Sequence, residues 1–105
     1  MPEPIRIRAR SNNDRTEVHV LMPHPMETGY RVDETGQAVA AHYITDVRIA
    51  VDAREVLHAT LSRAVSQDPL LFFRFQGGRP GQKITVAWTD TQGDRRVDEA
   101  LILGE

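Results

Sequence analysis

The sequence predicts a single all-β domain, an immunoglobulin-like antiparallel β-sandwich of about seven strands. Apolar and polar residues alternate in short runs, the pattern of half-buried strands, and no helical periodicity dominates. Gly, Pro, Asp and Asn separate these runs as turn residues do. The chain has 105 residues, the length of one domain with one core, so residues 1–105 are taken as one unit.

Two alternating runs near the amino-terminus predict the first hairpin. In residues 5–10, isoleucine and alanine alternate with arginine, so apolar and basic side chains take opposite faces. The polar segment SNND then supplies a turn. Residues 16–22 alternate again, and this strand ends at Pro23 because proline cannot donate to a strand ladder.

A long connection follows over residues 23–41 and carries two turn signals. A segment of this length in a compact domain is usually functional or disordered, and we expect it to be ordered and functional. Its prolines restrict φ and lower the entropy lost on ordering, and Gly29 is expected at positive φ. A small hairpin across DETG would pair Tyr30 and Val32 with Ala38 and Val39.

The remaining runs predict five more strands. A hairpin turn at Asp52-Ala53 joins the first two, and a polar crossover over 62–68, with one helical turn, ends at Pro69. The glycines of GGRPG and then Gly93 mark the last two turns. The five strands are 42–51, 55–61, 70–76, 83–89 and 95–103. The expected core includes Val20, Val47, Ile49, Leu57, Phe73, Phe75, Val86 and Trp88.

Composition excludes several classes of function. The chain has no cysteine, which removes disulfides, thiolate zinc sites, iron–sulfur clusters and a cysteine nucleophile. The formal net charge is −2 with both signs intermixed, so no basic footprint for nucleic acid is expected. The first ten residues lack the apolar run of a signal peptide, and no segment is long enough to span a membrane.

No catalytic constellation is found, so we predict no enzyme and no cofactor. The three serines occur in polar turns, and none lies in a strand-to-helix elbow. The pairs Asp33-Glu34 and Asp98-Glu99 are interpreted as turn and edge residues. GGRPG has no following helix to bind phosphate and is interpreted as a hairpin turn.

The segment MPHPM raises the question of copper. Met22, His24 and Met26 lie two apart, and thioethers with an imidazole suit Cu(I). Met22 is expected in the core, which leaves two ligands, too few for a site. The four histidines are expected to be solvated, and no metal is predicted. A free-standing copper-binding β-domain using the His24/Met26 loop stays as the alternative; a carbohydrate-binding or adhesion sandwich has too few exposed aromatics.

The aromatic strand, residues 70–76, has one apolar face and one face that mixes apolar and polar residues. Leu71, Phe73 and Phe75 should face the core. Leu70, Phe72 and Arg74 should face outward, and a large aromatic beside an arginine is a common composition of protein interfaces.

Three segments carry a family resemblance. They are HPMETGYRVDETGQAVAAHYITDV from His24 to Val47, DPLLFFRFQGG from Asp68 to Gly78, and VAWTDTQGD after it. Together they resemble the SoxZ family over most of the chain. The family usually has Asn-Pro where this chain has Asp68-Pro69, and often an Asn-Gly type of turn at Asp52-Ala53. Aspartate can replace asparagine at turns.

The resemblance implies the non-catalytic subunit of a SoxYZ-type carrier in thiosulfate oxidation. SoxY, its partner in a heterodimer, holds sulfur intermediates on a cysteine of a glycine-rich tail and presents them to the other sulfur-oxidation enzymes. The family also implies a periplasmic protein exported together with its partner. The partner-interface candidates are His24, Pro25, Met26, Glu27, Thr28, Gly29, Leu70, Phe72 and Arg74.

Overall fold

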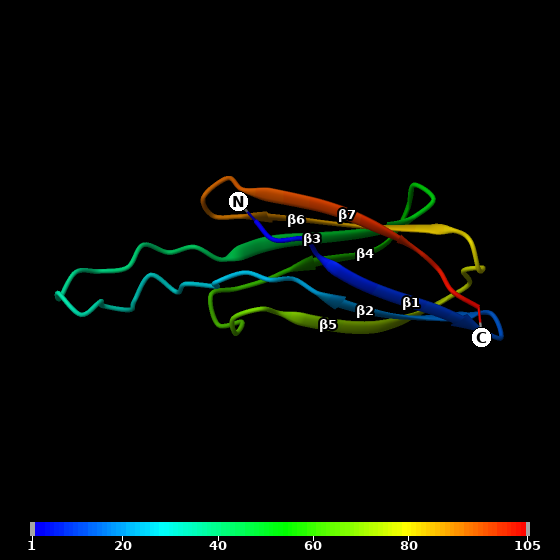
Figure 1. The fold of residues 1–105 in the computed structure, drawn as a ribbon, viewed down its shortest axis with the longest axis horizontal. Coiled ribbons are helices and arrows are strands. Elements are labelled where there is room, and N and C mark those ends of the chain that lie inside the picture. The colour runs from blue at the N-terminus through cyan, green and yellow to red at the C-terminus, as the bar shows by residue number, and fades with distance from the viewer. Residues whose placement is uncertain (1, 105) are drawn as a thin grey trace.

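The computed structural model describes residues 2–104 and places two antiparallel sheets face to face (Figure 1). The three-stranded sheet has the order β1 (Arg6–Asn12), β2 (Arg15–Leu21), β5 (Leu70–Gln76). The four-stranded sheet has the order β4 (Arg54–Thr60), β3 (Ile44–Val51), β6 (Lys83–Asp90), β7 (Arg95–Leu101). The predicted seven-stranded sandwich is confirmed. Over residues 2–104, no helix has the length and apolar character needed to cross a bilayer.

The core lies between the sheets and follows from the alternation along each strand. Thr16, Val18 and Val20 of β2 are fully buried, whereas the residues between them are exposed. The predicted core positions Val20, Val47, Ile49, Val86 and Trp88 are buried. Leu57, Phe73 and Phe75, predicted in the same core, are only half-buried at its margin. They belong to β4 and β5, which are edge strands with one neighbour each.

The carboxy-terminal segment joins the two sheets. Leu103 forms a parallel bridge with Arg10 of β1, in the other sheet from β7. The Ser11 amide donates to the Leu103 carbonyl at 2.8 Å, and the Leu103 amide donates to the Ala9 carbonyl at 2.9 Å. The last strand therefore ends at Leu101, short of the predicted residue 103, because the chain then crosses to β1.

The long connection is ordered and projects beyond the sandwich as an arm, residues 27–42 (Figure 1). The molecule measures 54 × 19 × 19 Å. Glu27 and His42 exchange two backbone hydrogen bonds at its base. A bridge between Val32 and Ala38 confirms the predicted hairpin across DETG.

Of two connections between strands, one departs from the sequence prediction and the other confirms it. The crossover 62–68 forms hydrogen-bonded turns, with the Val65 amide donating to the Ser62 carbonyl, where one helical turn was predicted. Pro69, four residues after Val65, leaves no room to continue a helix. The glycine turn after β5 is confirmed, and Gly78 has a φ of +86°. A Cβ at Gly78 would collide with Thr16 Oγ1 in the core, and the φ is positive, so this position requires glycine.

Candidate functional site

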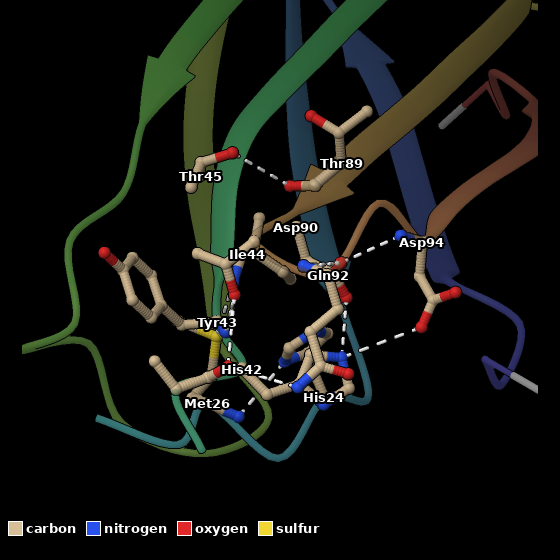
Figure 2. Close-up of polar contacts among 12 residues, drawn as sticks. His24, Met26, His42, Tyr43, Ile44, Thr45, Thr89, Asp90, Gln92 and Asp94 are labelled. Carbon is tan, nitrogen blue, oxygen red and sulfur yellow. Dashed lines mark hydrogen bonds and ion pairs between the residues drawn. The ribbon is translucent and has the colours of Figure 1, made fainter. Parts of the chain in front are cut away.

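A buried polar cluster lies at the end of the sandwich where the arm begins (Figure 2). His24 follows β2, His42 ends the arm, and Asp90 is the last residue of β6. His24 Nε2 is 2.9 Å from Asp90 Oδ2, and His42 Nε2 is 2.8 Å from the same oxygen. Three segments far apart in sequence therefore meet at one carboxylate.

Asp90 has a full set of hydrogen-bond donors. Its Oδ1 accepts the backbone amides of Gln92 at 3.0 Å and Asp94 at 2.9 Å, while Oδ2 faces the two histidines. Burial of this carboxyl group by itself raises its pKa. The hydrogen bonds from His24, Gln92, Asp94 and His42 outweigh burial, so the Asp90 pKa lies below its ordinary value. The group is thus a buried, charged carboxylate whose lone pairs are used within the protein.

The second nitrogen of His24 fixes the state of its ring. The Met26 backbone amide donates to His24 Nδ1 at 3.0 Å, so Nδ1 carries no proton. The neutral ring then holds its proton on Nε2 and donates it to Asp90. The ring also packs edge-on against Trp88, with centroids 5.0 Å apart.

The same three residues offer a donor set that transition metals use. His24 Nε2, His42 Nε2 and an Asp90 oxygen lie within 4.8 Å of one another, and two histidines with a carboxylate suit Zn²⁺ or Fe²⁺. A metal at His24 Nε2 would require the proton on Nδ1, where it would meet the Met26 N–H. Metal-bound histidines normally donate from that nitrogen to an acceptor. Here the group that faces His24 Nδ1 is itself a donor, the Met26 amide, so the geometry favours a hydrogen-bonded network over a metal site.

The expectation that the histidines are solvated is wrong for His24. Its residue is 4% exposed, because Asp90 and the Met26 amide satisfy both ring nitrogens in the core. His42 is half-buried, whereas His19 and His58 are exposed, as their strand alternation predicts. Burial of Met22 in the core is confirmed.

Met26 is also buried, and its φ is +50°. Its sulfur accepts the Ile44 amide at 3.3 Å and packs in the core. The two donors of the copper alternative are therefore both engaged inside the domain. Both residues are among the predicted interface candidates, and both side chains are buried within this chain.

The other candidates in this segment lie nearer to solvent. Pro25 is exposed, and Glu27 and Thr28 are half-buried at the base of the arm. Arg31 donates from Nε and Nη2 to the Glu27 carboxylate oxygens, at 2.8–3.2 Å. The predicted positive φ of Gly29 is confirmed at +92°.

The remaining candidates lie on β5 and point away from the core. Leu70 is 68% exposed, Phe72 is 48% exposed, and Arg74 is exposed. The His19 ring of β2 lies 4.5 Å from the Phe72 ring. These three residues thus lie on the outer face, as the alternation predicts.

An open pocket of about 460 Å³ adjoins the polar cluster. Both clustered histidines, Asp90 and Trp88 line it, together with carboxylates at its rim. Over residues 2–104, Trp88 Nε1 is a buried side-chain nitrogen without a hydrogen-bond partner. No ligand chemistry follows from this mixture of an acidic rim and an unpaired donor.

Sequence reasoning did not single out His42 or Asp90. One signal existed for Asp90: it is in phase with Val86 and Trp88, which both face inward, and a buried carboxylate needs donors. His42 gave no such signal, because its partner is 48 residues away.

Asp90 and Asp98 make the fold less stable at acidic pH. The Arg96 guanidinium lowers the Asp98 pKa and outweighs burial, while the Ile5 amide adds to this effect. Carboxyl groups with depressed pKa values stabilise the fold fully above their unfolded pKa of about 4, and this contribution is lost as the pH falls through the folded values. We expect the urea concentration at the midpoint of unfolding to decrease as the pH is lowered below about 4. The Asp98→Asn variant should show a shallower fall, and an unchanged slope would contradict this assignment.

Comparison with known proteins decides the family. A family model described as "Sulphur oxidation protein SoxZ" matches residues 5–100. This chain belongs to the SoxZ family. The resemblance found in the sequence is confirmed, and SoxZ membership supports a role in sulfur oxidation, in a system where SoxZ pairs with SoxY. A search of curated proteins finds no match.

Solved structures share the fold of this SoxZ chain at low identity. A superoxide reductase (neelaredoxin) from Ignicoccus hospitalis is 15% identical with a TM-score of 0.66, covering 99% of this chain and 82% of that one. A superoxide reductase in the oxidised state is 13% identical with a TM-score of 0.68, covering 96% and 88%. A hypothetical protein from Pyrococcus horikoshii OT3 is 14% identical with a TM-score of 0.65, covering 96% and 88%. These likenesses establish the architecture alone.

Proposed function

We propose that this chain is the non-catalytic subunit of a SoxYZ-type carrier of sulfur intermediates in thiosulfate oxidation. The family match over residues 5–100 carries the proposal. The absence of cysteine from all 105 residues supports it, because a covalent sulfur carrier needs a thiol and the partner would supply it. The other sulfur-oxidation enzymes would meet this subunit as part of the carrier complex.

The polar cluster supports a structural role rather than catalysis. Asp90 accepts from two histidines and two amides, and His24 has both ring nitrogens engaged. A general base needs a lone pair within reach of substrate, and these groups use theirs inside the protein. The cluster instead ties the base of the arm to the ends of β2 and β6.

An apolar area on the outer face of the three-stranded sheet is our proposed partner anchor. Leu70 and Phe72 of β5 are exposed, and Leu21 of β2 lies opposite Leu70. Because β5 is an edge strand, a partner can reach this area without displacing another strand. Exposed aromatic and aliphatic side chains at such a site are typical anchors of protein interfaces.

We propose a periplasmic location for the heterodimer. Membership of the SoxZ family supports this proposal, because the family resemblance implies export together with the signal-bearing partner. A complex that crosses a membrane folded must be tight, which favours an interface with an apolar centre.

Phe72→Asp should abolish pairing with the cysteine-bearing partner on coexpression and gel filtration. The carboxylate introduced by Phe72→Asp would be buried in an apolar interface without a compensating partner. Phe72→Ala alone should already cost about 2 kcal/mol or more of binding free energy. Val97→Asp is the matched control, because Val97 is similarly exposed (50%) on the outer face of the opposite sheet. Co-elution of both variants with the partner would show that the interface lies on another face. Failure of the wild-type chains to pair would reject the carrier-subunit proposal.

A further inference from the structure

The outer face of the three-stranded sheet brings together arginines from three strands. The strand register sets Arg8 opposite His19 and Arg10 opposite Glu17. Glu17 in turn lies opposite Arg74 of β5. All these residues are exposed, because they alternate with the buried positions. We call this the basic face, and its arginines are Arg6, Arg8, Arg10, Arg15 and Arg74.

The basic face carries an excess of positive charge, although the chain as a whole has a negative net charge. Over the three strands, five arginines share this face with one carboxylate, Glu17, whereas the chain has a formal net charge of −2. The alternation of the first strand predicted three arginines on one side. The addition of Arg15 and Arg74 depends on the pairing of β1 and β5 with β2.

The outer face of the other sheet has a different charge arrangement. Two of its cations have carboxylate partners: Arg48 Nη1 lies 2.9 Å from Glu55 Oε1, and Lys83 Nζ lies 3.6 Å from Glu99 Oε1. Over residues 2–104, by contrast, no ion pair within 4 Å involves any arginine of the basic face. The fold alone gives no reason for collecting unpaired like charges on neighbouring positions, since these repel one another.

The basic face also changes in character along the strands. At one end lie Leu21, Leu70 and Phe72, the proposed anchor. At the other end a shallow hollow of about 210 Å³ is lined by Arg15, Arg74 and neighbouring polar residues. An apolar area bordered by basic residues fits a protein surface that has an apolar centre and an acidic border.

We infer that the basic face docks an acidic surface of the cysteine-bearing partner, with the arginines steering association and fixing the register around the Phe72 anchor. This inference rests on the proposed function and adds the charge of the partner. Charge complementarity argues for the occupant, because five unpaired arginines gain carboxylate partners on docking. Single-stranded nucleic acid fits less well, because only Phe72 and His19 offer rings for base stacking on this face.

Charge reversal on the basic face should weaken pairing mainly through the association rate. Arg8→Glu with Arg10→Glu should lower the association rate constant for the partner about 10-fold or more at low salt, and the difference should shrink as salt is added. The control is Arg54→Glu with Arg95→Glu, which changes net charge equally on the four-stranded sheet and should alter the rate by less than about 3-fold. Stopped-flow association of the two purified chains provides the measurement, with circular dichroism to verify that each variant folds.

Each result of this experiment is decisive. Equal effects of the two double variants, or no effect of either, would overturn the basic-face inference and leave the carrier proposal standing. Absence of any association of the wild-type chains would reject the carrier proposal, and the inference with it. A fluorescent single-stranded oligonucleotide provides a second probe. If the wild type binds it in 0.15 M salt, and the Arg8→Glu/Arg10→Glu variant does not, the face belongs to nucleic acid and the acidic-partner inference is wrong.

Discussion

Replacement of Trp88 by alanine should destabilise the fold by about 3–5 kcal/mol. Trp88 is 1% exposed and is the largest fully buried side chain of the described residues, so truncation leaves a cavity between the sheets. The substitution also removes the edge-on contact with the His24 ring, 5.0 Å away. Chemical denaturation in urea measures the loss.

Two further variants make this prediction specific. Trp88→Phe should cost less, because it leaves a smaller cavity and removes the unpaired Nε1 donor. Val97→Ala is the surface control, since Val97 is 50% exposed on the neighbouring strand and should change stability by about 0.5 kcal/mol or less. A loss below about 1 kcal/mol for Trp88→Ala would contradict its position in the core.

Replacement of Asp90 by alanine should cost about 3–5 kcal/mol as well, by a different mechanism. The variant leaves both histidine Nε2 donors and two backbone amides without their acceptor, in a site where the Asp90 side chain is fully buried. Loss of this acceptor also frees His42, so the base of the arm should loosen. Urea denaturation gives the stability, and amide hydrogen exchange at Glu27 and His42 reports on the arm.

Asp94 provides the matched control for Asp90. It belongs to the same turn, but its side chain is 53% exposed and its carboxylate lies 3.7 Å from His42 Nε2. Asp94→Ala should therefore change stability by about 1 kcal/mol or less. Equal losses in the two variants would show that the turn, rather than the buried carboxylate, holds this end of the domain together.

Local patterns were sufficient to predict the strands but not the site. The positions of Val18 and Val20 follow from alternation with period two, and the breaks follow from Pro and Gly, so the seven strands could be predicted. The half-burial of Leu57, Phe73 and Phe75 could not be predicted from alternation, because it depends on which strands lie at the edges of the sheets.

The polar cluster and the basic face depend on pairing over long distances in sequence. His24 and Asp90 are 66 residues apart, and their contact requires the two sheets to stack with β2 and β6 ending together. Likewise, Arg10 and Arg74 share one face only because β2 lies between their strands. Alternation identifies the side of a strand on which a residue lies, and it does not identify the neighbouring strand.

The bridge between Leu103 and Arg10 has a consequence for assembly. It joins the β1 and β7 sides of the sandwich, so that the chain itself covers backbone groups that another strand would need. The opposite side ends in β5 and β4, each with one neighbouring strand among residues 2–104. Sheet extension by a second polypeptide is therefore directed to that opposite side, where β4 begins with charged residues and β5 is rich in aromatics. The β1 and β7 side is therefore partly covered by the chain itself, whereas among residues 2–104 no such bridge covers the β4 and β5 side.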